Sequence, residues 1–166
     1  MGVAQKAEAG AKRKSRGEAE DGALDFGRIE DLLGYHLRRA QVLMFQDFAE
    51  AMSQHGISPG QIGVLLLVAA NPGINQTTVG SALGIVRSTL VSMLDRLEER
   101  KVIARNPSPR DRRSHALALT SRGEAFLQEV LPVLDAHEGR IAAALDADER
   151  ATLIALLRRV GRADRA

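Results

Sequence analysis

The stretch "INQTTVGSALGIVRSTLVSMLDRLEERKVI" (residues 74–103) decides the fold. Its apolar spacing predicts a short helix over about 75–83 and a longer helix over about 86–100. Gly84 lies between them at the position of a tight turn. Because two short helices joined by a glycine-containing turn are the signature of a helix-turn-helix, we predict that motif here.

The second of these helices has two unlike faces. Leu90, Leu94 and Leu97 recur at helical spacing together with Val91, so this side is predicted to be buried. The other side carries hydroxyl and guanidinium groups, which can contact base edges and phosphates. The candidate contact residues on this helix are Arg87, Ser88, Thr89, Ser92 and Arg96. Arg96 has an alternative partner in Glu99, three positions along the helix.

A basic hairpin is predicted to follow. "VIARN" (102–106) and "SHALAL" (114–119) have the pattern of two strands, and "PSPRDRR" (107–113) is the loop between them. Residues 86–113 hold eight Lys and Arg residues against four Asp and Glu, although the net charge of the whole chain is only +2. A local basic patch in a near-neutral protein indicates a polyanionic partner. The alternative for the loop taken alone is a solvated cluster of charges.

Long amphipathic helices are predicted on both sides of this module. Apolar residues recur at helical spacing from Leu24 to His55, and a buried helix follows from an N-cap at Ser58. Ser121 with Glu124 is predicted to cap a helix that runs to about Leu145 and is kinked at Pro132, and Asp146 with Glu149 to cap the last helix. The apolar stripes of these helices are best covered by each other and by a second copy of the chain, which predicts a homodimer.

The expected fold class is therefore mainly α, with a small two- or three-stranded β-wing. It is a winged helix-turn-helix flanked by long N- and C-terminal dimerisation helices. The expected domains are a disordered tail (1–22), an N-terminal dimerisation and ligand helix (23–56), a winged helix-turn-helix DNA-binding domain (57–120) and C-terminal dimerisation helices (121–166).

Composition excludes several classes of function. The chain has no cysteine, so disulfides and thiolate chemistry are excluded. Its four histidines lack metal-ligand spacing, and no phosphate-binding loop or nucleophile elbow is present, so we expect neither an enzyme nor a metal or cofactor. The longest apolar run, "VLLLVAA" (64–70), is too short for a membrane span, and the N-terminal residues do not resemble a signal peptide. We expect a cytoplasmic protein without a membrane partner.

In these motifs the sequence resembles the MarR family of bacterial transcription regulators. The most specific match is "DRRSHALALTSRG" (111–123), which fits the family's wing pattern, and the resemblance covers about residues 30–160. Two positions depart from the family's pattern. Lys101 stands where glycine usually follows the recognition helix, and Val86 stands where a small polar N-cap is expected.

The resemblance assigns roles to the wing. It implies that Asp111 orients Arg113, which enters the DNA minor groove, where negative potential favours a guanidinium. Arg110 and Arg112 are then placed to contact the flanking phosphates, and Arg105 is a further candidate DNA-binding residue of the wing. A twofold dimer implies double-stranded DNA with an inverted-repeat operator as partner, and the family default is repression.

The resemblance also implies a small-molecule effector, for which we expect an aromatic carboxylate or an acyl-CoA thioester. Aromatic and cationic residues gather in "GYHLRRAQVLMFQDF" (34–48). The candidate pocket residues are Tyr35, His36, Arg38, Arg39, Phe45 and Phe48. Core or dimer packing is the alternative role for these aromatics. A different function would be a winged helix that serves as an architectural or protein-interaction module without a ligand.

Overall fold

The computed structural model describes residues 24–107 and 115–160, and the chain divides into two compact units, Met1–His36 and Leu37–Ala166. The predicted tail (1–22) lies outside the described residues. In the first unit a 3₁₀ helix, η1 (Gly27–Asp31), precedes α1 (Leu33–Ala51), so the predicted continuous helix from Leu24 is wrong in its first nine residues. Gly27 has a left-handed backbone (φ 52°), and Leu32 is extended, which separates the two helices.

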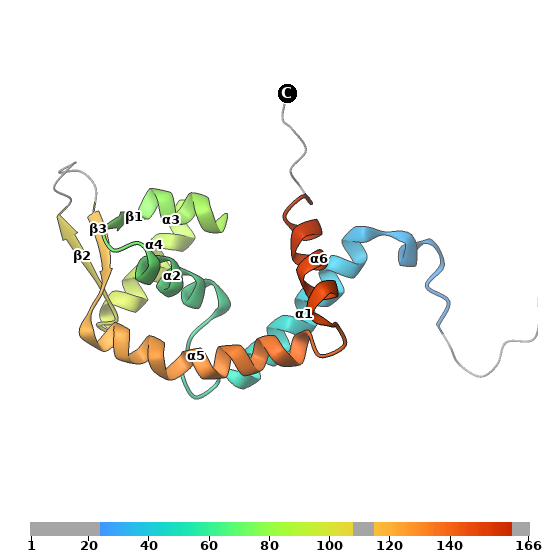
Figure 1. The fold of residues 1–166 in the computed structure, drawn as a ribbon. Coiled ribbons are helices and arrows are strands. Elements are labelled where there is room, and N and C mark those ends of the chain that lie inside the picture. Colours follow the sequence, from blue (N-terminus) through green and yellow to red (C-terminus); the bar gives the residue numbers. More distant parts are fainter. Residues whose placement is uncertain (1–23, 108–114, 161–166) are drawn as a thin grey trace, which may run out of the picture. The chain divides into compact units, whose positions relative to one another are not determined.

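The second unit contains a winged helix-turn-helix. Its elements in chain order are α2 (Pro59–Ala70), β1 (Ile74–Asn75), α3 (Gln76–Leu83), α4 (Arg87–Glu99), β2 (Ile103–Pro107) and β3 (His115–Leu119) (Figure 1). The strands form one antiparallel sheet in the order β1-β3-β2. The predicted fold class is confirmed, and the third strand is the two-residue β1, which pairs Ile74 with Leu117.

Local chemistry sets most of the helix ends. Ser58 and Gln61 form the predicted capping box at the start of α2. Gly84 ends α3 in a left-handed conformation with φ 64°. Lys101 adopts the same region with φ 58°, so the backbone turn after α4 is kept although its residue is not glycine. Val86 occupies the N-cap position of α4 but provides no side-chain hydrogen bond, because valine has no polar side-chain atom.

Two helices complete the unit, α5 (Ser121–Ile141) and α6 (Ala147–Leu157). The N-cap of α5 is Thr120 and not the predicted Ser121, because the Thr120 hydroxyl accepts the Gly123 N–H and also donates to the Lys101 carbonyl. The helix continues through Pro132. The predicted capping box of Asp146 with Glu149 is confirmed.

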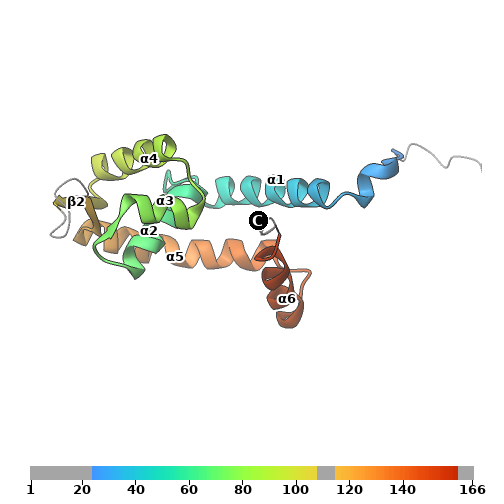
Figure 2. The ribbon, with the colours of Figure 1, turned by 90° about the horizontal axis from the view of Figure 1, so that it is seen from above.

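The core lies where α2, α4 and the sheet meet α1 and α5. Val64, Leu65 and Val68 of α2 are fully buried, as predicted for a helix that is apolar almost all round. The C-terminal part of α1 lies beside α5 (Figures 1 and 2), where Asp47 of α1 is bonded to His137 and Arg140 of α5. By contrast, α6 buries no residue. The described chain contains no single helix that is long and apolar enough to cross a membrane. Only α3 and α4 taken together have the required length and hydropathy, and the two helices are bent by 115° relative to each other.

Gly123 fixes how closely α5 approaches the strand that follows α4. A Cβ atom at this position would lie 1.9 Å from the Val102 carbonyl oxygen, which is backbone and cannot rotate away. We therefore expect Gly123→Ala to lower the free energy of unfolding by about 3 kcal/mol or more, measured by urea denaturation. Gly139→Ala in the same helix is the control. Its Cβ meets nothing within 4 Å, so it should stabilise by about 1 kcal/mol. Equal effects of the two substitutions would contradict the steric argument.

Candidate functional site

The burial of α4 determines which of its side chains are available to a partner. Leu90 is 2% exposed, and Leu94 and Leu97 are fully buried. The helix therefore presents its opposite side to solvent, and all five candidate residues of the recognition helix are exposed there. These residues are Arg87, Ser88, Thr89, Ser92 and Arg96.

Charge is distributed unevenly along α4. Its first two turns carry Arg87 and no acidic residue, whereas Asp95, Glu98 and Glu99 follow in the second half. Oriented N–H groups at the helix N-terminus add a partial positive charge. The N-terminal half is thus the part of α4 suited to a polyanion, and it carries the hydroxyls of Ser88 and Thr89.

Arg105 is bound to the acidic half of α4. Its Nη2 donates to Asp95 Oδ1 at 2.6 Å, and its Nη1 lies 3.5 Å from Glu98 Oε2. The side chain is 20% exposed, and its buried Nε has no hydrogen-bond partner among the described residues. Arg105 therefore neutralises carboxylates that would repel phosphate and ties β2 to α4. Direct DNA contact by Arg105 stays a prediction.

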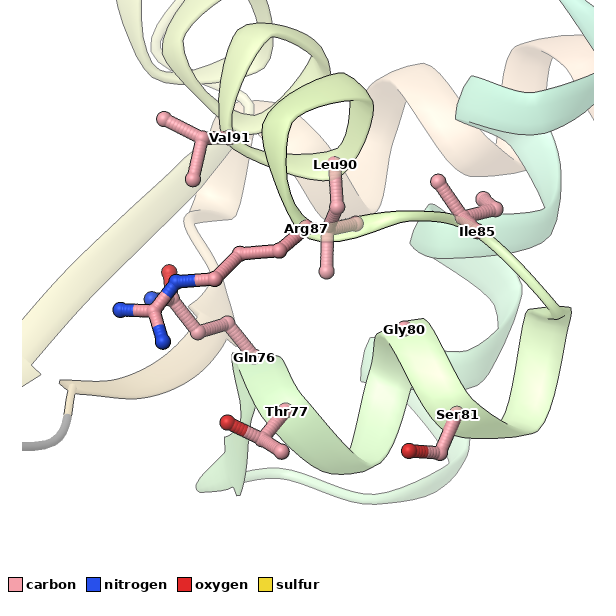
Figure 3. A pocket seen from close by; sticks show the side chains of 8 residues that line it. All are labelled: Gln76, Thr77, Gly80, Ser81, Ile85, Arg87, Leu90 and Val91. Carbon is pink, nitrogen blue, oxygen red and sulfur yellow. The ribbon is translucent and has the colours of Figure 1, made fainter.

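A hollow of about 200 Å³ lies between α3 and the start of α4 (Figure 3). The figure shows the Arg87 side chain extending beside Gln76, with the hydroxyls of Thr77 and Ser81 along α3. Sequence reasoning did not select Gln76 and Thr77. The available signal was their position directly after the Asn75 N-cap, because the first turn of a helix presents free N–H groups.

The hairpin that follows α4 is formed by β2 and β3. These strands pair from Ile103 opposite Leu119 to Pro107 opposite His115. The predicted wing residues Arg110, Asp111, Arg112 and Arg113 lie outside the described residues, and their roles stay predictions.

A larger cavity of about 470 Å³ opens between α1 and the start of α2. One wall is formed by Phe45, Phe48 and Ala49 of α1 and by Met52 and Ser53, which directly follow this helix. The other wall comes from the connecting segment and the first turn of α2, and it consists of Gly56, Ile57, Ser58, Pro59 and Gln61. None of these lining side chains is charged, so the cavity suits an apolar or neutral group.

The predicted pocket residues do not all line the cavity. Phe45 and Phe48 line the cavity. Tyr35 and His36 belong to the N-terminal unit, where the Tyr35 ring lies 6.2 Å from that of Phe26. The Arg38 guanidinium donates to Gln41 Oε1 at 3.0 Å. A pocket role for the whole set stays a prediction. In the described part of the chain, no cluster of three or more acidic or histidine side chains could hold a metal ion.

An ion-pair network fixes the α1 wall of the cavity to α5. Asp47 Oδ2 accepts from His137 Nδ1 at 2.9 Å, and Arg140 Nε donates to Asp47 Oδ1 at 2.7 Å. His137 is 2% exposed, and its ring meets the cavity residue Phe48 edge-on. The hydrogen bonds from Arg140 and then His137 hold the pKa of the Asp47 carboxyl well below its usual range. The same carboxylate raises the pKa of Arg140.

A helix-turn-helix followed directly by a two-stranded hairpin defines a winged-helix protein, and comparison with known proteins narrows this class. The MarR family model matches residues 55–114. A Thauera aromatica protein, named for a regulatory role at the hcr operon, is 36% identical over 92% of this chain and 94% of its own length. The chain belongs to the MarR family.

Solved structures of two transcriptional regulators are similar over most of the chain. The transcriptional repressor CouR bound to a 23-mer DNA duplex is 42% identical with a TM-score of 0.80, covering 85% of this chain and 100% of CouR. CouR bound to p-coumaroyl-CoA is 40% identical with a TM-score of 0.75, covering 85% and 99%. PcaV from Streptomyces coelicolor, in complex with its natural ligand, is 31% identical with a TM-score of 0.76, covering 86% and 98%.

The depressed pKa of Asp47 gives a pH-dependent prediction. A carboxyl with a lower pKa in the folded state stabilises fully above its unfolded pKa of about 4, and this contribution is lost as the pH falls below that value. Asp47→Asn should therefore melt at a lower temperature than wild type at pH 7, with a difference that shrinks below about pH 4. Asp135→Asn, which removes an exposed carboxylate of α5, is the control. A difference that stays constant from pH 7 to pH 3 would refute the ion-pair account.

The Arg105 ion pairs predict a suppressor. Arg105→Ala should weaken binding to a DNA duplex about tenfold, because Asp95 and Glu98 lose their counter-charge. Adding Asp95→Asn should recover most of this loss in fluorescence anisotropy titrations. Asp95→Asn alone corrects for the general gain from removing a negative charge. If Arg105 instead contacts phosphate directly, adding Asp95→Asn to Arg105→Ala will increase DNA affinity no more than Asp95→Asn increases the affinity of the native protein.

Proposed function

We propose that this protein is a homodimeric transcriptional repressor that binds an inverted-repeat operator and is released from it by the coenzyme A thioester of an aromatic acid. The observation that carries the DNA-binding part is the N-terminal half of α4, where Arg87, Ser88, Thr89 and Ser92 are exposed and the first two turns contain no acidic residue. Helix-turn-helix proteins place this part of the recognition helix in the major groove.

Dimer formation is supported by apolar surface on α6 and near it. The side chains of Leu153, Ile154, Leu156 and Leu157 are between 42% and 49% exposed in the single chain. A contiguous apolar surface of this kind marks a protein interface, and a second copy can bury it with twofold symmetry. Two recognition helices related by that symmetry would meet successive major grooves, so the operator should be an inverted repeat.

The wing completes the DNA contact. The paired strands β2 and β3 end at Pro107 and His115, and the sequence between these two residues includes Asp111 and Arg113. In this proposal Asp111 orients Arg113 in the minor groove, while Arg110 and Arg112 contact flanking phosphates. Gln76 and Thr77, at the first turn of α3 beside Arg87, are further candidates for phosphate contact.

The effector part is supported by the chemistry of the 470 Å³ cavity. In this proposal an aromatic ring packs against Phe45 and Phe48, whereas a free carboxylate buried beside them would have no cation among the lining residues. A thioester carbonyl is neutral and avoids this cost. Arg38 precedes Phe45 by seven residues, or two turns on the same face of α1, about 10 Å along the helix. Arg38 can therefore pair with an anionic group that extends out of the cavity, as the phosphates of a coenzyme A thioester would.

The alternative is an architectural or protein-interaction winged helix without a ligand. It explains the basic surface equally well, but it gives no role to an apolar cavity of ligand size beside α2. The CouR complex with p-coumaroyl-CoA favours the regulator, because that neighbour combines DNA binding with thioester binding in the same fold.

Selection of duplexes from a random library, followed by anisotropy titration, tests the proposal. We expect an inverted repeat bound at least ~10³-fold more tightly than random duplex, and release of this duplex by p-coumaroyl-CoA but not by the same concentration of p-coumarate. Phe45→Ala should weaken release at least tenfold while leaving operator affinity unchanged. Binding without sequence preference would favour the architectural alternative. Release by the free acid alone would contradict the thioester assignment.

A further inference from the structure

We infer that Arg100 is a positioning residue that transmits occupancy of the cavity to the recognition helix, through the segment that connects α1 to α2. This inference rests on the proposed function only in treating the cavity as the effector site. It names a physical link that neither the fold nor the family assignment specifies.

The first step is the anchorage of Arg100 at the end of α4. Its Nη1 donates to the Gly56 carbonyl at 2.8 Å, and its Nη2 donates to the His55 carbonyl at 2.9 Å. The guanidinium also lies 4.8 Å from the ring centre of Phe126 on α5. Two parallel hydrogen bonds from one planar group to consecutive carbonyls define its orientation closely, and they are charge-assisted.

The second step is the position of the cavity on the other side of the same segment. Gly56, Ile57 and Ser58 form part of the cavity wall. Gly56 therefore lines the cavity and also provides a carbonyl that accepts from Arg100. A group that fills the cavity and displaces this segment must also displace the carbonyls that hold α4.

The third step is a second contact between this wall and α4. Gly60 approaches Met93 so closely that an added Cβ would lie 2.8 Å from the Met93 Cε. Ser58 and Gln61 line the cavity, and they also line a separate hollow of about 310 Å³ whose other residues, all on α4, are Thr89, Ser92, Met93 and Arg96. The first turn of α2 thus lies between the cavity and the side chains proposed to face DNA.

The third element in contact with the segment is α5. His55 Nδ1 lies 3.3 Å from Glu129 Oε1, and its ring meets Phe126 edge-on at 6.3 Å between ring centres. The Arg100 guanidinium lies over the ring of Phe126 as well. The donor Arg100 and the acceptor residue His55 therefore both contact the same aromatic ring of α5. Displacement of the segment is then passed to the C-terminal end of α4. The DNA-facing residues begin at Arg87, about 20 Å away along the 13-residue helix, so a small tilt is amplified there.

A filling substitution tests the link without any effector. Ala49→Phe places a ring in the cavity from the α1 wall, and it should weaken binding to the duplex selected from the random library at least tenfold. In an Arg100→Met background, which keeps an apolar stem on Phe126 but removes both hydrogen bonds, the same filling should weaken binding less than twofold. Lys101→Met is the matched control. It removes one positive charge from the adjacent residue, so the tenfold effect of filling should persist.

Amide hydrogen exchange provides a readout that a purely structural role would not produce and that needs no DNA. The Ala49→Phe substitution should change amide exchange in residues 87–99 of the native and Lys101→Met proteins and leave it unchanged in Arg100→Met.

Arg100→Lys is used in place of Arg100→Met if thermal melting shows that the latter does not fold. A lysine ammonium cannot bond both carbonyls in the way that the planar guanidinium does. Equal effects of filling in all backgrounds, or no effect in the native protein, overturn the inference. Because no thioester is used, failure of p-coumaroyl-CoA to release DNA would contradict the proposed function and leave this result standing.

Discussion

The burial of three leucines on one side of α4 is the constraint on which the rest of the site depends. Successive residues of a helix are rotated by 100°, so a slip of one residue would expose Leu94 and turn Ser88 and Ser92 away from the surface. Complete burial of Leu94 and Leu97 makes that slip costly by several kcal/mol. The rotation of the helix, and hence the identity of the DNA-facing residues, follows from core packing and not from the polar residues themselves.

Features set by local chemistry could be predicted from the sequence. The capping box at Ser58, the left-handed turn at Gly84 and the burial of α2 depend on residues close together in the chain, and all are confirmed. A prediction failed where two neighbouring residues were equally suitable as the helix N-cap and a group distant in the sequence determined which one was used. Thr120 and Ser121 both carry a hydroxyl group that could cap the helix. The Thr120 hydroxyl also donates to the carbonyl of Lys101, which lies 19 positions earlier in the sequence.

The candidate site was less predictable because its parts meet only in three dimensions. A count of charges groups Arg105 with the basic loop, but in the fold it faces Asp95 and Glu98 and cancels their charge. Phe45 and Phe48 of the aromatic pattern line the cavity, and their role in ligand binding stays a prediction. The pattern did not indicate the opposite wall, because a concave surface depends on the angle between α1 and α2, which periodicity does not encode.

The two walls of the cavity differ in how readily they can move. On α1, Asp47 is held by a buried imidazole and a guanidinium, and Phe48 packs against that imidazole, so displacement would separate charges at a partly buried site. The opposite wall is connecting main chain, and it contains Gly56 in a left-handed conformation. Glycine can change its backbone angles at low cost, and carbonyl acceptors tolerate a range of donor directions. Occupancy should therefore displace the connecting wall, whose carbonyls accept from Arg100 at the end of α4, and leave the α1 wall in place. This difference directs the response toward the recognition helix.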